Sequence, residues 1–304
     1  MTDSHRRARA GFLLGLAAFI LWGVIPLYFK LLVHIPPIDM VAQRIIWSLL
    51  LLGGLIASWR RWGAVRAALA QPRVVATLCA TAILVSCNWL VYIFAVIHDQ
   101  VLAASLGYFL NPLVNVLLGV VLLHERLSRT QVLAVAFACV GVAALAVEAA
   151  ADLWISLVLA CSFSFYGFLR KIAPVEAVEG LAIETALLSP IALGWLLWQH
   201  LHGAGSFGSD RLTDALIVLS GTVTAVPLLL FHAAAKRLPY SNLAFLAYIG
   251  PSLQFVLAVL VFGERLTLAH AICFGAIWIA LIISSIGGVR DSRAAARERA
   301  AAGL

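Results

Sequence analysis

Two charged residues inside apolar segments are the strongest candidates for chemistry in this sequence. Arg44 lies in the segment AQRIIW, and Glu184 lies 140 residues later in the segment AIET. An ionised side chain in an apolar environment is costly, so its presence favours a functional role. Arg44 and Glu184 could pair with each other or bind opposite ends of a zwitterionic substrate. The alternative is that each charge lies near a helix end and reaches out toward water.

Polar and aromatic side chains at helical spacing form a second group of candidates. Asn88, Trp89 and Tyr92 share one helical face, and a later segment repeats this spacing around Pro112. Pro112 is expected to interrupt its helix and free a backbone carbonyl. The alternative role is hydrogen bonding between helices for Asn and anchoring for Tyr. With two tyrosines from the C-terminal half, the predicted substrate-binding site is lined by Arg44, Asn88, Trp89, Tyr92, Tyr108, Asn111, Asn115, Tyr166, Glu184 and Tyr248.

Motifs for catalysis, cofactors and metals are absent or out of context. GAGSFG at residues 203–208 matches a dinucleotide-binding pattern, but no strand is predicted before it. His124 and Glu125 start like a zinc protease motif, but Ser128 stands where the second His is needed. The sequence has no GxSxG and no Walker A motif. We therefore predict a protein that is not an enzyme and has no catalytic residue, cofactor or metal.

The elements that hold these residues are expected to lie in a membrane. The chain has 304 residues, of which 63% are hydrophobic and 12% are charged. In soluble domains about 45–50% of residues are apolar and about 25% are charged. Such a chain cannot cover its own surface with polar groups, and it is too apolar to be disordered. The net charge of +7 comes from scattered residues without a basic face, so nucleic acid is not an expected partner. The expected partner of this chain is the lipid bilayer.

Ten apolar runs can cross a bilayer as helices, since a spanning helix needs about 20 residues. They are separated by short polar breaks, as at residues 98–100. The predicted spans are 10–32, 39–59, 74–97, 101–123, 130–147, 153–169, 178–198, 212–235, 240–262 and 268–288. The segment 59–73, which combines Trp and Arg residues, is predicted to lie at the membrane surface.

The distribution of cations predicts how the spans are oriented. Seventeen of the 21 Lys and Arg residues fall in alternate breaks and termini on one side, and three fall on the other. Cytoplasmic loops carry the excess of Lys and Arg. We therefore predict a multi-pass protein of the bacterial inner membrane with both termini in the cytoplasm, which requires an even number of spans.

An internal repeat divides the chain into two halves. At an offset of 139, Pro112 matches Pro251, and the segment ERL at residues 125–127 matches ERL at 264–266. The predicted units are residues 1–150 and 151–304, with five spans each, so the second is inverted in the membrane. Inverted repeats are typical of secondary transporters, which bind substrate near the midplane and expose it to alternate sides. The prediction is an all-α membrane protein of two inverted five-helix repeats around a central cavity.

The same segments carry a resemblance to a known family. NWLVY at 88–92, SLGYFLNPLVN at 105–115 and ERL at 125–127 resemble RarD-type members of the EamA family, in the drug/metabolite transporter superfamily. In the second half, ET at 184–185, VTAVPLL at 223–229 and YIGP at 248–251 agree. The resemblance implies ten helices, a central cavity and transport of small metabolites or drugs. Ala247 departs from the Gln that the family pattern implies, so one polar contact is missing.

The repeated acidic residues of the ERL segments are predicted to be structural. Glu125 and Glu264 would lie at tight turns and anchor them, and Thr267 would cap the last predicted span. Neither glutamate is therefore included among the candidate binding residues.

These observations predict a secondary transporter that exports small amphipathic metabolites or drugs by alternating access. The alternatives are an amino-acid exporter, favoured if Arg44 and Glu184 hold a zwitterion, and a membrane receptor that transports nothing. The expected partners are a small-molecule substrate, the bilayer and protons as coupling ion, in a monomer or homodimer. Burial makes a carboxylate bind its proton more readily, so Glu184 is the predicted proton carrier. A Glu184→Gln variant that keeps full pH-driven transport would exclude that role.

Overall fold

The part of the chain described by the computed structural model is entirely helical in its regular elements. The described residues are 3–123, 129–148, 150–208, 210–235, 237–238 and 246–283. Seven of their helices are long and apolar enough to cross a membrane. Helices suit this environment because they satisfy their own backbone hydrogen bonds. The predicted class of an all-α membrane protein is therefore confirmed.

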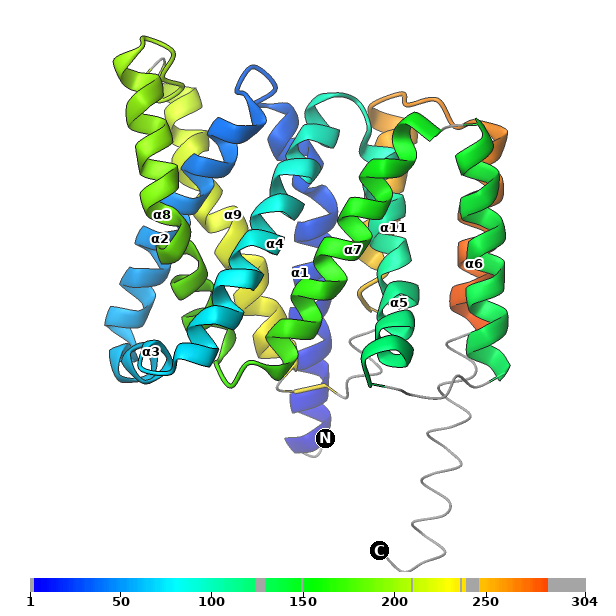
Figure 1. Ribbon diagram of the computed structural model, residues 1–304, viewed down its shortest axis with the longest axis horizontal. Helices are drawn as coiled ribbons and strands as arrows, with labels where there is room; N and C mark the ends of the chain where they lie inside the picture. The colour runs from blue at the N-terminus through cyan, green and yellow to red at the C-terminus, as the bar shows by residue number, and fades with distance from the viewer. Residues whose placement is uncertain are drawn as a thin grey trace, which may run out of the picture.

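The helices stand side by side, and successive long helices run in opposite directions (Figure 1). Three shorter apolar helices, within α6, at Ile249–Val261 and at Leu268–Ile283, overlap the remaining predicted spans. The count of ten spans in two inverted halves stays a prediction. The helices are α1 (Asp3–Lys30), α2 (Pro37–Ser58), α3 (Trp62–Leu69), α4 (Pro72–Ile97), α5 (Val101–Leu123), α6 (Arg129–Glu148), α7 (Ala150–Ile172), α8 (Ala177–Leu201), α9 (Arg211–Ala235) and α11 (Ile249–Val256), which continues as a π-helix at Leu257–Val261.

Some predicted features lie outside the described residues. These are Glu125 and the rest of the first ERL segment, the start of the predicted span 240–262 and the end of the span 268–288. The predicted surface segment 59–73 contains the short helix α3, which buries Val65 and Ala68 and exposes Trp62. Its one-sided burial is typical of a helix that lies along a surface.

Proline does not break the long helices, so the predicted interruption at Pro112 is wrong. α5 runs through Pro112, and α9 runs through Pro227. A proline removes one backbone donor, and packing on both sides keeps the rest of the helix in place. Pro251 lies in the first turn of α11, where its missing N–H has no helical acceptor.

Close backbone contacts hold the helices that carry the candidate residues. α2 packs against α8 and α9, and α7 packs against α4 and α5. Glycine makes two of these contacts possible. Between α2 and α9, a Cβ on Gly221 would lie 2.6 Å from the carbonyl oxygen of Trp47. Between α5 and α7, a Cβ on Gly107 would lie 2.8 Å from the carbonyl oxygen of Ser156. Small residues at crossing points are the usual means of packing helices in lipid.

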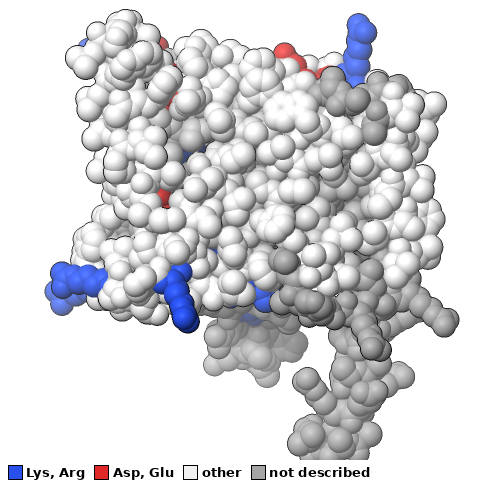
Figure 2. Space-filling view, in the orientation of Figure 1, with Lys and Arg blue, Asp and Glu red and all other residues white. Residues whose placement is uncertain are grey.

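Charge is nearly absent from the broad side of the molecule (Figure 2). The charged residues visible there lie mainly at the upper and lower edges, and Lys and Arg predominate at the lower edge. α1 begins at the lower edge, and the helix Leu268–Ile283 ends there (Figure 1). The uncharged band between the edges fits the apolar interior of a bilayer.

Candidate functional site

Arg44 is a buried cation for which the described part of the chain supplies no carboxylate partner. Its side chain lies about two turns from the start of α2 and is 6% exposed. The Nε atom donates a hydrogen bond to Thr224 Oγ1 of α9 at 2.6 Å. No acidic residue in the described part of the chain forms an ion pair with Arg44. The guanidinium is therefore bonded to the protein but not neutralised by it.

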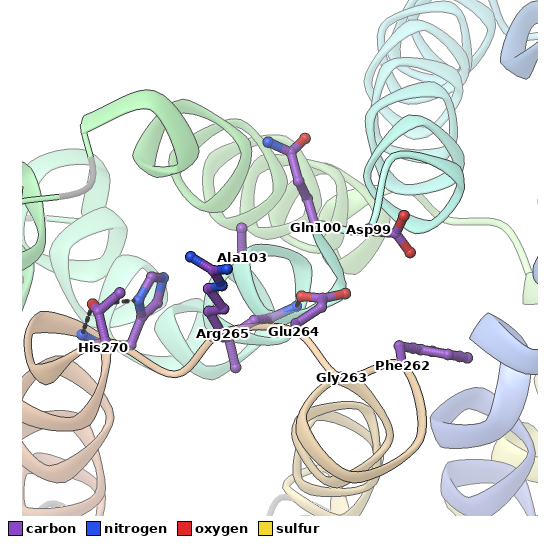
Figure 3. Close-up of a pocket in the computed structure, with 10 residues that line it drawn as sticks. Asp99, Gln100, Ala103, Phe262, Gly263, Glu264, Arg265 and His270 are labelled. Atoms are coloured by element: carbon purple, nitrogen blue, oxygen red, sulfur yellow. Dashed lines mark hydrogen bonds between the residues drawn. The ribbon is translucent and has the colours of Figure 1, made fainter.

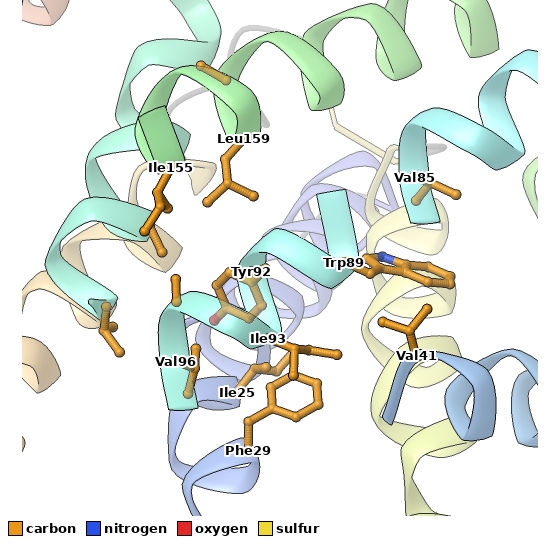
Figure 4. Packing of buried hydrophobic residues seen from close by; sticks show 14 of the residues in the cluster. Ile25, Phe29, Val41, Val85, Trp89, Tyr92, Ile93, Val96, Ile155 and Leu159 are labelled. Atoms are coloured by element: carbon orange, nitrogen blue, oxygen red, sulfur yellow. The ribbon is translucent and has the colours of Figure 1, made fainter. Parts of the chain in front are cut away.

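Aromatic rings from α1 and α4 surround this cation. The Arg44 guanidinium carbon lies 4.3 Å from the centre of the Trp89 ring and 5.9 Å from that of Phe29. Figure 4 shows Trp89 and Phe29 in one packed cluster with Tyr92. The negative face of an aromatic ring attracts a cation, but it does not accept strong hydrogen bonds as a carboxylate does.

A chain of ring contacts links the Arg44 region to Asn88. The Phe29 and Tyr92 rings lie 6.2 Å apart, and the Tyr92 and Tyr108 rings lie 5.7 Å apart. Tyr108 then donates its hydroxyl to Asn88 Oδ1 at 3.1 Å. Tyr92 has a buried hydroxyl with no hydrogen-bond partner among the described residues. One polar atom in the middle of this cluster is thus unused.

Asn88 joins three helices. Its Nδ2 atom donates to the Leu159 carbonyl at 3.2 Å and to Ser162 Oγ at 3.0 Å, both on α7. Its Oδ1 atom accepts the bond from Tyr108 of α5. All of these contacts are between helices, as in the alternative role considered for Asn. Asn88 therefore fixes the position of Tyr108.

Glu184 lies in a second polar cluster with its own cation. Its carboxylate is fully buried and accepts bonds from Thr81 Oγ1 at 2.7 Å and the Tyr166 hydroxyl at 3.4 Å. Arg170 Nε lies 3.6 Å from Glu184 Oε1. Of the two options considered for Arg44 and Glu184, direct pairing is therefore not what the structure shows, because the cation beside Glu184 is Arg170. α7 extends past its apolar run to Ile172, which brings Arg170 onto the helix.

The Arg170 side chain lies in a space left by a glycine. A Cβ on Gly180 would overlap the Arg170 guanidinium. Arg170 Nη2 also donates to the carbonyls of Glu176 and Ala177, at 3.3 and 3.4 Å, at the start of α8. Bonds to the last residue before a helix and to its first turn orient the guanidinium toward Glu184. This cluster contains both charges of an ion pair, and Arg170 Nη1 has no hydrogen-bond partner among the described residues.

The remaining candidates are more scattered. Asn111 has a buried Oδ1 without a described partner, and its carbonyl accepts a bond from Ser164 Oγ at 3.3 Å. Asn115 lies exposed on α5. Tyr248 is half-buried just before α11 and packs against the main apolar cluster. The structure thus brings together five predicted residues (Arg44, Asn88, Trp89, Tyr92 and Tyr108) and places Tyr166 with Glu184.

A separate pocket of about 480 Å³ lies between the α4–α5 turn and the segment after the π-helix (Figure 3). This turn is at the upper edge of the molecule in Figure 1. None of the predicted site residues lines the pocket. Glu264 lies in its wall and accepts the backbone N–H groups of Val101 and Leu102, both at 2.7 Å. Burial raises the pKa of Glu264 above its ordinary value, and the two backbone bonds oppose this rise. Lys30 forms an ion pair with Asp99 beside it.

These contacts confirm the structural roles predicted for the second ERL segment. Glu264 caps the first turn of α5, which satisfies backbone donors that have no helical acceptor. Thr267 Oγ1 accepts the backbone N–H of His270 at 3.4 Å, at the start of the last described helix. The Glu264 cap joins the segment after the π-helix to the start of α5. The sequence did not indicate that these two segments are in contact.

Four important residues were not among the predicted ones: Phe29, Thr81, Arg170 and Thr224. Thr224 donates to the Ser220 carbonyl at 2.8 Å. The Thr81 hydroxyl, whose single proton is directed to Glu184, also lies 3.0 Å from the Leu78 carbonyl oxygen of its own helix. A hydroxyl that can bond its own helix gives no sequence signal of a partner. Arg170 follows an apolar run and is indistinguishable in sequence from a loop cation. No group of three metal-binding side chains occurs among the described residues.

Comparisons with known proteins agree with this architecture. Residues 9–147 match the model of the EamA-like transporter family. An uncharacterized transporter of Pseudomonas aeruginosa is 44% identical over 94% of this chain and 96% of its own length. Protein RarD of Escherichia coli is 40% identical over 95% of this chain and 98% of its own length.

A crystal structure shares the fold at lower similarity. It has a TM-score of 0.56 and 22% identity, and the match covers 91% of this chain and 97% of that one. The family assignment rests on the sequence relatives, which match nearly from end to end at 40% identity or more. The chain therefore belongs to the EamA-like transporter family, as a RarD-type member.

Proposed function

We propose that this membrane transporter is a secondary transporter that exports small amphipathic molecules across the bacterial inner membrane. Its substrate would bind at the cluster of Arg44, Trp89, Tyr92 and Tyr108. The observation that carries the proposal is the unneutralised guanidinium of Arg44, which is buried among aromatic rings. A buried charge without a partner is expensive, and transporters keep such charges on their substrate pathways.

The proposed mechanism is alternating access between two inverted halves, residues 1–150 and 151–304, around a central cavity. Arg44 and Glu184 lie at corresponding depths in α2 and α8, about two turns from the start of each helix. These two helices run in opposite directions (Figure 1), which supports an inverted relationship. In such transporters one half rocks against the other around a site near the midplane.

The proposed orientation places both termini in the cytoplasm. Seventeen of the 21 cations lie on one side in the predicted topology, and cytoplasmic loops carry this excess. α1 begins at the lower edge, where Lys and Arg predominate in Figure 2. In this orientation the Glu264 pocket faces the periplasm. Labelling of cysteines introduced at the two edges, in intact cells and in inverted vesicles, tests this arrangement.

Proton coupling through Glu184 is the finer part of the proposal. Protonation of Glu184 would remove the charge that pairs with Arg170, so the ion pair at 3.6 Å would weaken. That change could be linked to movement of α7 against α8. The zwitterion-binding alternative loses support, because Glu184 already has a partner within the chain.

Reconstitution into liposomes tests the proposed function. Purified protein is assayed with a panel of labelled small metabolites and drugs, with and without a pH gradient, against liposomes without protein. We expect protein-dependent movement of at least one amphipathic solute. If no solute of the panel moves under either condition, the chain is not an exporter of this kind. If movement is unchanged by the pH gradient, the proton-coupled part alone is wrong.

A further inference from the structure

The other deeply buried carboxylates of the described segments have cation or hydrogen-bond contacts within the chain, and none of these contacts involves Arg44. Glu184 pairs with Arg170 at 3.6 Å, and Glu179 lies 2.8 Å from Arg61 Nε. Asp39 accepts bonds from Trp195 Nε1 at 2.7 Å and Ser206 Oγ at 2.8 Å. None of these carboxylates is free to neutralise Arg44. The acidic groups that could serve as its counterion are already committed elsewhere.

The hydrogen bonds of Arg44 show what kind of group is missing. A guanidinium has five N–H donors in a planar fork, and only one bond to a described residue is formed, through Nε to Thr224. Thr224 is neutral and already donates to the Ser220 carbonyl. The group that best matches the unused donors is an oxyanion with two acceptor oxygens, because it can form two parallel bonds to the fork.

Unused hydroxyls lie along the same helices. Ser48 follows Arg44 by one turn on α2, which packs closely against α9. The hydroxyls of Ser48 and Tyr92 are buried without a hydrogen-bond partner among the described residues. Buried polar atoms are usually paired. Ser48 and Tyr92 are therefore buried hydroxyls without a described partner, on the helices that carry Arg44 and Trp89.

The aromatic side chains near Arg44 indicate what the uncharged part of the ligand is. Trp89 and Phe29 lie against the Arg44 guanidinium, and the Tyr92 ring lies 6.2 Å from that of Phe29. Flat apolar surfaces of this kind favour an aromatic or apolar body. We infer that the substrate class is an amphipathic organic monoanion, whose carboxylate binds Arg44 and whose apolar body packs against Trp89 and Tyr92. This inference rests on the proposed transport function and narrows its substrate.

A series of probes with one ring and different charges tests the inference. Phenylacetate, phenylacetamide, 2-phenylethylamine and phenylalanine represent the anion, the neutral form, the cation and the zwitterion. Binding of each to purified protein is measured at pH 7 by calorimetry and by quenching of Trp fluorescence. We expect phenylacetate to bind about tenfold or more tightly than the other three, because only it supplies an oxyanion without adding a buried cation.

Variants of Arg44 test whether the preference for phenylacetate depends on the guanidinium. Arg44→Gln is expected to remove the preference for phenylacetate, and Arg44→Lys to keep part of it, because Lys keeps the charge and loses the planar fork. Arg66→Gln, on the exposed face of α3, is the matched control and is expected to bind all probes as the unaltered protein does. The comparison of probes on the unaltered protein stands even if an Arg44 variant does not fold.

The inference is wrong if the amide, amine or zwitterion binds as tightly as phenylacetate, or if none of the four probes binds. It is also wrong if a folded Arg44→Gln variant keeps the preference. Failure of the proposed function is a different result. Liposomes that move only neutral or cationic solutes would leave transport intact and exclude the anion, whereas liposomes that move nothing would exclude transport.

Discussion

The surroundings of Arg44 and Glu184 differ although the two residues occupy corresponding places in α2 and α8. Glu184 has an arginine, a threonine and a tyrosine around its carboxylate. Arg44 has one threonine and two aromatic rings around its guanidinium. The Glu184 cluster is complete in charge because it contains its own cation, whereas no carboxylate among the described residues pairs with Arg44. The difference supports the proposal that Arg44, rather than Glu184, binds the substrate.

Removal of the arginine from the complete cluster is expected to have the largest effect on stability. Arg170→Gln leaves the fully buried Glu184 without a cation. Loss of one partner of a buried ion pair typically costs about 3–5 kcal/mol. Thermal unfolding of the purified protein in detergent should show a clear decrease in Tm, and the double variant Arg170→Gln/Glu184→Gln should recover most of it. An unchanged Tm for the single variant would mean that the pair is not formed.

Removal of the arginine from the incomplete cluster is expected to affect transport rather than stability. Arg44→Gln should lower uptake of an anionic probe at least tenfold, which corresponds to about 1.4 kcal/mol. The Tm should fall much less than for Arg170→Gln, because no opposite charge is left unpaired. Uptake into liposomes and thermal unfolding are measured on the same preparation. A large decrease in Tm with normal uptake would reverse the roles assigned to the two clusters.

A smaller effect is expected from filling the space beside Arg170. Gly180→Ala places a methyl group where the guanidinium lies, so Arg170 must move away from Glu184. We expect a loss of about 1 kcal/mol, since the displaced ion pair outweighs the helix propensity gained by Ala. Gly194→Ala in the same helix, where the added Cβ meets no atom within 4 Å, is the control and should stabilise slightly. Equal Tm values for the two variants would contradict this packing.

The smallest effect concerns pH at the upper edge. Burial raises the pKa of Glu264 in the folded chain above its value in the unfolded chain. The folded state then binds this proton more tightly, so the contribution of Glu264 to stability decreases as pH rises through the interval between the two pKa values. Glu264→Gln should remove that part of the slope when Tm is followed from about pH 4 to pH 7. Identical slopes for both proteins would show that the carboxyl titrates as it would in water.

Hydropathy located most helices but not all of their ends. The predicted span 101–123 coincides with α5, whereas the predicted span 153–169 falls short of α7 at both ends. An apolar run marks the part of a helix that lies in lipid, and polar residues can continue the helix beyond it. At α7 the missing turn carries Arg170, so an error of a few residues in a boundary concealed the partner of Glu184.

Sequence identified polar residues in the interior but not their partners. Helical spacing placed Asn88 and Tyr92 on one face of one predicted span and Tyr108 on a face of the next, and the structure joins the two faces. Thr224 and Phe29 come from helices distant in sequence, and neither residue type is unusual in a membrane helix. Their contact with Arg44 depends on how α1, α2 and α9 pack, which no local pattern encodes.

Exchange of phenylacetate across liposome membranes without a pH gradient tests the contrast between the two clusters most directly. In this mode no proton needs to be carried, so only substrate binding and movement are required. We predict that Arg44→Gln abolishes exchange and that the double variant Arg170→Gln/Glu184→Gln, which removes both charges of the complete cluster, retains it. Retained exchange in Arg44→Gln, together with its loss in the double variant, would show that the substrate does not bind at Arg44.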